Sequence, residues 1–97
     1  MSTAVIRYQT KPEAADENQR LVENVFAELA LKAPPGVRYQ SFRLDDGVSF
    51  LHIATGGEAL QDLPAFQEFQ RDLASRLAEG PDRTEATQIG RYEASQG

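Results

Sequence analysis

The sequence predicts one small domain of the α+β class, with strands and helices in the order β-α-β-β-α-β. Three observations lead to this prediction. Short segments rich in β-branched and aromatic residues alternate with two segments that repeat apolar residues at helical spacing. An Asp-Asp-Gly sequence joins two of the short segments, as a tight turn would. The chain of 97 residues has the length of a single domain, so we assign residues 1–97 to one domain.

The first strand and the first helix are indicated by residues 4–32. Residues 4–10 (Ala-Val-Ile-Arg-Tyr-Gln-Thr) are few and rich in strand-forming types. Pro12 fits the first turn of a helix, where no amide donor is needed. The helix is expected over residues 13–32, because Ala-Pro-Pro-Gly follows and stops it. One stripe of this helix should face the core: Asn18, Leu21, Val22, Val25, Phe26 and Leu29.

A β-hairpin is predicted for residues 37–55. Residues 37–44 and 48–55 have strand-forming composition, and Asp45-Asp46-Gly47 lies between them. An Asp-Gly pair tolerates the positive φ that tight hairpin turns require. The second and third strands should therefore be antiparallel neighbours.

The second helix and the fourth strand complete the order. Pro64 fits a first helical turn, and an apolar face is expected to run from Leu63 to Leu77. Gly80-Pro81 is expected to end this helix. Residues 84–93 are then predicted as the fourth strand.

This order predicts a ferredoxin-like sandwich, with both helices on one face of a four-stranded antiparallel sheet and the first and third strands in its centre. The third strand has large apolar residues on both faces: Phe50 on one, Leu51 and Ile53 on the other. An uncovered apolar face usually marks an interface, and symmetric pairs are the commonest oligomers. We therefore expect a homodimer, in the form of a dimeric α/β barrel. A monomer with a few exposed aliphatic side chains would also explain the pattern.

Composition excludes several classes of function. The formal net charge is −5 and the basic residues are scattered, so no nucleic-acid partner and no anionic membrane surface is expected. The absence of cysteine excludes disulfides, thiol catalysis and iron–sulfur clusters, and agrees with a cytoplasmic location. No secretory signal or membrane span is expected. Asp45-Asp46 lacks the carboxylate cluster that a hard cation needs, so no metal site is expected.

The chain resembles the antibiotic biosynthesis monooxygenase-like (ABM) group of dimeric α/β-barrel proteins. The likeness covers nearly the whole domain. It rests on Val-Ile-Arg-Tyr at residues 5–8 followed by Lys-Pro, on the long first helix and on the third strand. It also rests on Leu-Pro-Ala-Phe-Gln-Glu-Phe at residues 63–69, which resembles the group's pattern of a proline followed by paired phenylalanines.

The resemblance implies a monooxygenase-like oxidoreductase that acts without a cofactor on a small aromatic or quinol-type substrate. Haem-degrading enzymes also belong to the group. Two departures matter. The chain has no tryptophan, and Thr-Gly-Gly at residues 55–57 stands about where the group often has one. Asp62-Leu63 replaces the histidine that many members have before the proline. Haem degradation is disfavoured, because the only histidine lies on a strand and no helical histidine is available as an axial ligand.

His52, the only imidazole, is the candidate catalytic residue. Its ordinary pKa lies near neutrality, so it could act as a base toward a phenol. Alternatively, it is a core or interface histidine that is hydrogen-bonded to a neighbour. The sequence does not decide whether His52 and Phe50 face the helices or the outside of the sheet.

Aromatic residues are candidates for binding a flat ligand, because small-molecule pockets are mostly apolar. Plain core packing is the alternative, and it is the simpler explanation for the phenylalanines of the helices. Each tyrosine of the strands carries a hydroxyl that needs a partner, which favours a place in a pocket. The candidate ligand-binding residues are Tyr8, Tyr39, Phe50, Phe66 and Phe69.

The sequence is compatible with two functions. The first is a cofactor-independent oxygenase in which His52 deprotonates the substrate and the substrate anion reduces dioxygen. The second is a non-catalytic dimer that binds a small apolar molecule or a protein, which explains the missing tryptophan without further assumption.

Overall fold

The computed structural model describes residues 3–94 and shows the expected order of elements. The strands are β1 (Thr3–Thr10), β2 (Arg38–Arg43), β3 (Ser49–Thr55) and β4 (Leu77–Ala86). The helices are α1 (Ala15–Lys32), α2 (Pro64–Arg71) and the short α3 (Leu73–Arg76). Two 3₁₀ segments, η1 (Pro12–Ala14) and η2 (Gly57–Asp62), precede α1 and α2. The predicted fold class is confirmed.

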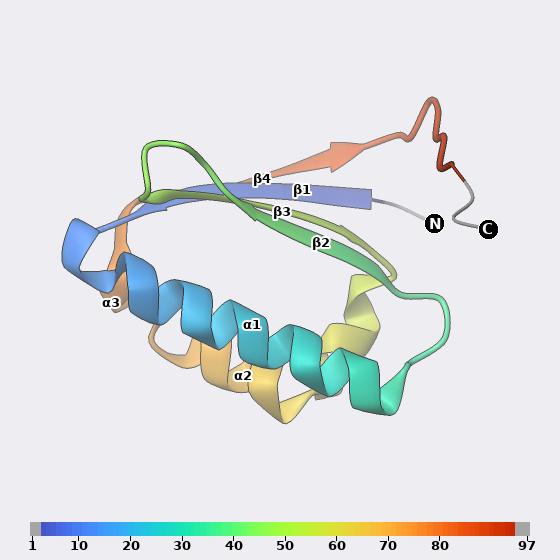
Figure 1. The fold of residues 1–97 in the computed structure, drawn as a ribbon, viewed down its shortest axis with the longest axis horizontal. Coiled ribbons are helices and arrows are strands. Elements are labelled where there is room, and N and C mark those ends of the chain that lie inside the picture. Colours follow the sequence, from blue (N-terminus) through green and yellow to red (C-terminus); the bar gives the residue numbers. More distant parts are fainter. Residues whose placement is uncertain (1–2, 95–97) are drawn as a thin grey trace.

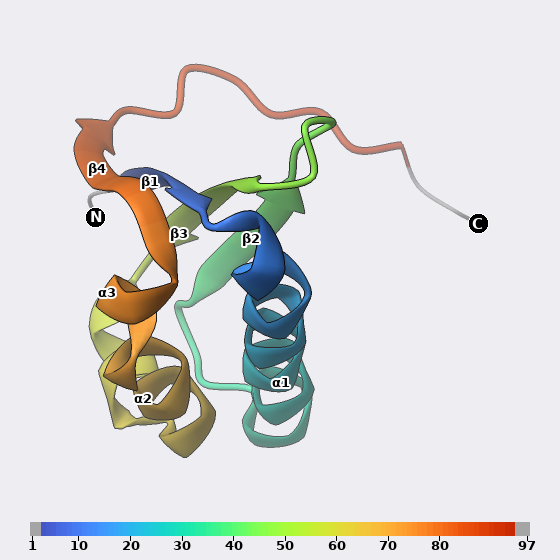
Figure 2. The same ribbon diagram turned by 90° about the vertical axis from the view of Figure 1, so that its left-hand side faces the viewer.

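The four strands form one antiparallel sheet in the order β2-β3-β1-β4. The first and third strands are therefore central, as the crossover rule predicts. Both long helices lie on the same side of the sheet, so the molecule has two layers (Figures 1 and 2). Across the central pair, Ile6 is paired with His52 and Tyr8 with Phe50. The register fixes which side chains share a face, because directly paired residues point to the same side.

The predicted stripe of α1 faces the sheet. Val25 is completely buried, and Leu21 and Val22 are nearly so. Phe26 and Leu29 are half-buried and pack against the same core. Leu31, which lies off the stripe, is 87% exposed. Helical spacing alone thus identified the buried side of α1.

The hairpin between β2 and β3 turns at the predicted residues. Gly47 has φ +79°, a conformation that favours glycine. The Asp46 carboxylate accepts hydrogen bonds from the backbone N–H groups of Val48 and Ser49, at 3.0 and 2.8 Å, and from the Ser49 hydroxyl. An aspartate in this role ties the turn to the first residue of β3.

The end of the second helix and the fourth strand differ from the sequence prediction. The helix breaks at Asp72, and β4 begins at Leu77, where a continuing helix was expected. Gly80-Pro81 lies inside β4 and does not stop a helix. Of the predicted fourth strand, residues 84–93, only residues 84–86 belong to β4, which begins seven residues earlier and ends at Ala86. The prediction from Gly80-Pro81 was wrong because β4 is an edge strand with an irregular register against β1. Such a strand accommodates a proline and a glycine of positive φ.

The outer face of the sheet has no helical cover (Figure 2). Val5, Leu51 and Ile53 are half-buried there, and Phe42 is 45% exposed. The chain after β4 runs along this outer side, away from both helices (Figures 1 and 2). It carries Ile89 and Tyr92, which are almost fully exposed. Within residues 3–94, no helix is both long enough and apolar enough to cross a membrane.

Candidate functional site

His52 faces the helices. It lies in the middle of β3, on the same side as Phe50, and only 2% of it is exposed. Its ring is 5.7 Å from that of Phe69 on α2, measured between centroids. The ambiguity that the sequence left open is therefore resolved: the imidazole lies between the sheet and the helices and not on the outer face of the sheet.

Both nitrogens of His52 have hydrogen-bond partners from neighbouring strands. Nε2 lies 2.8 Å from the Tyr8 hydroxyl of β1. Nδ1 lies 2.6 Å from the Ser41 hydroxyl and 2.9 Å from the Tyr39 hydroxyl, both of β2. Sheet register explains the contacts on this side, because Ser41 is paired directly with His52 and Tyr39 is two residues away on the same face.

The hydrogen-bonded cluster continues from Tyr8 to the helices. The Asn18 side-chain amide of α1 donates to the Tyr8 hydroxyl at 2.8 Å. Arg76, at the end of α3, donates through Nε to the Asn18 side-chain oxygen at 3.0 Å. It also donates through Nη2 to the backbone carbonyl of Phe69 at 2.6 Å. We call the set of Arg76, Asn18, Tyr8, His52, Tyr39 and Ser41 the polar chain.

Aromatic rings pack around the polar chain. Tyr8 stacks on Phe50 at 5.6 Å and on His52 at 5.3 Å between ring centroids. Tyr39 stacks on His52 at 5.7 Å and on Phe26 at 5.0 Å. The hydrogen bonds of Tyr8 with His52 and Asn18 are buried, and hydrogen bonds in such surroundings are stronger than those exposed to water.

A cavity of about 450 Å³ opens between the sheet and α2. Its sheet wall includes His52, Tyr8 and Tyr39, and its opposite wall includes Phe66, Phe69 and Leu60. The volume falls within the range of small-molecule sites, and so does the composition of mostly apolar walls with a few polar groups. The cavity could therefore hold a flat aromatic molecule against the polar chain.

Burial controls the protonation of the groups around the cavity. Burial lowers the pKa of His52 from 6.5 to about 4, so the free protein holds a neutral imidazole at pH 7. Burial raises the pKa of Tyr39 to about 12, although a hydrogen bond with Ser41 opposes the rise. Burial also raises the pKa of Tyr8, against the opposing effect of its hydrogen bond with Asn18. The site is thus uncharged at the imidazole and at both phenols.

The structure brings most of the proposed site residues together. Tyr8, Tyr39, His52, Phe66 and Phe69 all line the cavity. Phe50 packs behind Tyr8 in the core and contributes by supporting that ring. The catalytic and ligand-binding roles of these residues remain predictions.

Sequence reasoning missed three residues of the polar chain as site residues: Asn18, Ser41 and Arg76. An asparagine within the apolar stripe of α1 was the one available signal, because a buried amide needs hydrogen-bond partners. Arg76 gave no signal, since arginine on a helix is usually solvated. Here it is 7% exposed and lies over the Phe69 ring, with its guanidinium carbon 5.5 Å from the ring centroid.

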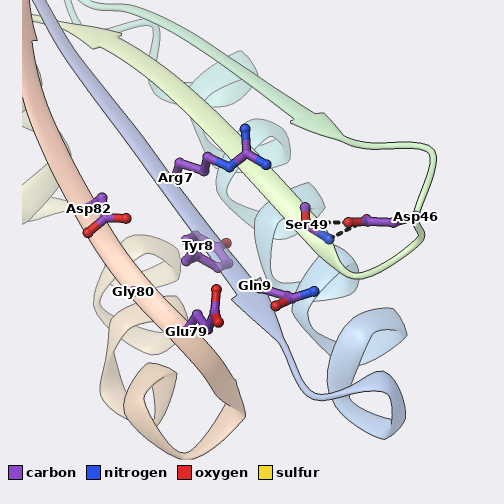
Figure 3. Close-up of a pocket in the computed structure, with 8 residues that line it drawn as sticks. All are labelled: Arg7, Tyr8, Gln9, Asp46, Ser49, Glu79, Gly80 and Asp82. Carbon is purple, nitrogen blue, oxygen red and sulfur yellow. Dashed lines mark hydrogen bonds between the residues drawn. The ribbon is translucent and has the colours of Figure 1, made fainter.

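A smaller hollow of about 220 Å³ lies over β1, between β4 and the turn that joins β2 to β3 (Figure 3). Arg7, Glu79 and Asp82 are among its walls, and the Asp46–Ser49 contact lies at one side (Figure 3). Its lining is charged and polar, which does not suit a flat apolar ligand. Among residues 3–94, no three metal-ligating side chains gather in one place. The aromatic-lined cavity, whose wall contains His52 and both tyrosines of the polar chain, is therefore the candidate site.

The geometry defines a class of protein first: a ferredoxin-like α+β sandwich with a partly apolar cavity between the sheet and α2. Comparison with solved structures then identifies the fold more closely. A protein from Nitrosomonas europaea, described as a putative antibiotic biosynthesis monooxygenase, superposes with a TM-score of 0.74 at 12% identity over 91% of this chain and 89% of its own. One of the same description from Caulobacter crescentus gives 0.72 at 16% identity over 92% and 90%.

SnoaB from Streptomyces nogalater, a cofactor-independent oxygenase, superposes with a TM-score of 0.67 at 20% identity over 93% of this chain and 94% of its own. Another structure with this fold, also from Nitrosomonas europaea, is described as a protein of unknown function. No protein-family model and no curated protein sequence matches the chain. The chain therefore has the fold of the structures named antibiotic biosynthesis monooxygenases, as its sequence resemblance implied, and at these identities the likeness concerns the fold.

Proposed function

We propose that the protein is a cofactor-independent oxygenase that acts on a small, flat aromatic molecule carrying an acidic hydroxyl or enol group. The observation that carries this proposal is a buried imidazole, hydrogen-bonded to two tyrosines, in the wall of a cavity lined by aromatic rings. SnoaB, which shares the fold, is described as a cofactor-independent oxygenase and supports the proposal. The polar chain supplies a proton acceptor, and the aromatic walls hold the ring system.

The first step is removal of a proton from the substrate. Both nitrogens of His52 already have partners, so the substrate proton reaches the imidazole through a hydroxyl. In this step the substrate O–H gives its proton to the Tyr8 oxygen, and Tyr8 passes its own proton to Nε2 of His52. Tyr8 ends the step neutral, His52 is an imidazolium, and the substrate is an anion.

The low pKa of His52 in the free protein is compatible with this role. It results from burial, which disfavours the charged ring when no anion is near. A substrate anion in the cavity would supply an opposite charge next to the imidazolium and raise the pKa of His52 again. The ion pair then forms only when the substrate is present, which is the behaviour required of a base in a dry site.

The anion is then the reductant of dioxygen. One electron passes from the anion to dioxygen, and the resulting substrate radical and superoxide combine at carbon. The peroxide takes the proton back from His52, and loss of water leaves a carbonyl group. For an anthrone, the overall reaction converts one methylene group and one molecule of dioxygen into one carbonyl group and one molecule of water. No cofactor enters the balance.

Oxygen consumption with a panel of anthrones and quinols tests this function. We expect uptake with at least one of them, and its loss in His52→Ala. Tyr8→Phe should also abolish it, because it removes the relay hydroxyl, whereas Tyr92→Phe changes an exposed hydroxyl and should leave the rate unchanged. Unchanged uptake in His52→Ala would refute the assignment of the base.

A second function is a non-catalytic dimer that binds a small apolar molecule. Gly56 and Gly57 line the cavity at the place where a tryptophan was expected from the family resemblance, which favours this alternative. It predicts saturable binding of aromatic compounds with no oxygen uptake for any of them. Turnover of a single substrate would exclude it.

The proposal includes a homodimer in which the outer faces of two sheets cover each other, in the cytoplasm. The half-buried aliphatic side chains of this face and the exposed Phe42 support the dimer. The absence of cysteine supports the location.

A further inference from the structure

The hydrogen bonds of the polar chain follow one donor-to-acceptor order, and Arg76 determines that order. A guanidinium group has hydrogen-bond donors only, so the Asn18 atom that faces Arg76 must be the side-chain oxygen. This contact removes the usual ambiguity of an asparagine amide, whose oxygen and nitrogen could otherwise be exchanged. The other end of the amide is then the NH₂ group, and it faces the Tyr8 hydroxyl at 2.8 Å.

The donor-to-acceptor order continues from Asn18 through Tyr8 to His52. The Tyr8 oxygen accepts a hydrogen from Asn18, so the hydroxyl hydrogen of Tyr8 must find an acceptor elsewhere. Nε2 of His52, at 2.8 Å, is the acceptor that the described residues provide. A buried hydroxyl without an acceptor is unfavourable, so Nε2 should carry no hydrogen of its own. A neutral imidazole has one hydrogen, which must then be on Nδ1.

We infer that Arg76 is a positioning residue for His52: acting through Asn18 and Tyr8, it holds His52 as the neutral tautomer with its hydrogen on Nδ1. The inference deepens the proposed function, since Nε2 is then ready to receive the relayed proton. Its first part concerns the free protein and does not depend on catalysis.

The tautomer determines what the polar chain presents to a ligand. The Nδ1 hydrogen is donated to Ser41 or Tyr39, so neither hydroxyl can donate its own hydrogen to His52. Each hydroxyl hydrogen then needs another acceptor. Tyr39 lines the cavity, so it is the residue that presents its hydroxyl hydrogen to a bound molecule. The ligand should therefore place an acceptor oxygen, such as a ketone or an enolate oxygen, against Tyr39, a conclusion that rests on the proposed function.

Nitrogen NMR on the free protein tests the tautomer. His52 is the only histidine, so labelled histidine gives a single pair of ring nitrogen signals. We expect a protonated Nδ1 and an unprotonated Nε2 in the unsubstituted protein at about pH 7. A spectrum with the hydrogen on Nε2 would overturn the inference without any variant.

Asn18→Asp reverses the chain and provides the sharpest variant. A carboxylate still accepts from Arg76 but cannot donate to Tyr8, so Tyr8 must donate to it and accept from Nε2 of His52. The His52 hydrogen should then move to Nε2. Asn24→Asp makes the same change at an exposed position of α1 and should leave the tautomer unchanged. A folded Asn18→Asp protein with its hydrogen still on Nδ1 would contradict the inference.

Arg76→Met removes the donor that orients Asn18, and it should give a mixture of the two tautomers. Arg76→Lys keeps a donor and should restore much of the Nδ1–H form. Arg71→Met, at an exposed arginine of α2, is the matched control. A purely structural role for Arg76 would lower stability in both Arg76 variants without changing the ratio of tautomers, and that result would also contradict the inference.

The donor at Tyr39 is tested with two bicyclic probes of the same shape, 1-tetralone and tetralin, which differ by one carbonyl oxygen. We expect the ketone to bind about tenfold more tightly, as one added hydrogen bond would give. Tyr39→Phe should abolish the preference and Tyr92→Phe should retain it. An equal affinity for both probes would overturn the assignment of the donor. If neither probe binds, the proposed aromatic cavity is wrong. The tautomer is tested independently of the probes, by the nitrogen NMR spectrum of the free protein.

Discussion

Acidification should destabilise the protein through His52. The unfolded chain binds a proton at this residue with a pKa of 6.5, whereas the folded protein resists protonation until about pH 4. Between these values the unfolded state holds more protons, so the free energy of unfolding falls as the pH falls. The difference between the two pKa values, 6.5 in the unfolded chain and about 4 in the folded protein, corresponds to about 3 kcal/mol of the free energy of unfolding. About 2 kcal/mol of this is lost when the pH falls from about 7 to about 5.

Urea unfolding at about pH 7 and about pH 5 measures this effect. His52→Gln is the reference, because it keeps hydrogen-bonding groups but does not titrate. The carboxyl groups of Glu17 and Asp46, whose pKa values are lowered by hydrogen bonds from Arg20 and Ser49 respectively, lose their charge at lower pH and equally in both proteins. The unsubstituted protein should lose about 2 kcal/mol more than the variant. Equal losses, or an NMR titration of His52 near its ordinary pKa, would refute the reasoning.

Three further predictions follow from the fold. Gly80→Ala should lower the free energy of unfolding by about 1 to 3 kcal/mol, because Gly80 has φ +92° and an added Cβ would lie 3.0 Å from a backbone oxygen. Urea unfolding measures the change, and Gly90→Ala, where an added Cβ would meet no atom within 4 Å, is the control. Val25→Ala should lower it by about 2 to 3 kcal/mol, since Val25 is completely buried, whereas Leu31→Ala at an exposed site should have little effect. Ile53→Glu should convert the proposed dimer to a monomer in sedimentation equilibrium, and Leu31→Glu should not; a monomer before any substitution would contradict the proposal.

Much of the fold could be predicted from the sequence, because its determinants are local. The stripe of α1 needs only helical spacing, and the hairpin needs only Asp-Gly between two strand-forming segments. The central position of β1 and β3 follows from the handedness of the crossovers, which is a general rule. These features do not require knowledge of any contact between distant residues.

The fourth strand could not be placed in this way. Leu77 continues the apolar repeat of the preceding helix, so its spacing favours a helix, but in the structure it pairs with Thr10 of β1. Pairing between residues so far apart in the chain outweighs a local helical preference, and nothing in residues 73–81 signals it. A Gly-Pro pair after an apolar helical repeat favours the end of a helix, but an edge strand also accommodates such a pair, as it does at Gly80-Pro81.

The candidate site was predicted in part. The strand tyrosines and His52 were identified because polar groups on aromatic rings need partners. The partners themselves were not, because Asn18 and Arg76 are 58 positions apart and meet only in the folded chain. The choice of face for His52 depended on the register of β3 against the helices, which alternation could not give when both faces are apolar.

The polar chain has a consequence for how this sequence can change. Each member is the hydrogen-bond partner of the next, so replacement of one member leaves a buried neighbour without a partner. Replacement of several members together can restore a complete set of hydrogen bonds. Variation at Asn18, Tyr8, His52 and Arg76 should therefore be strongly epistatic, and a mutational scan of pairs should show coupling there that is absent from the solvent-facing side of α1.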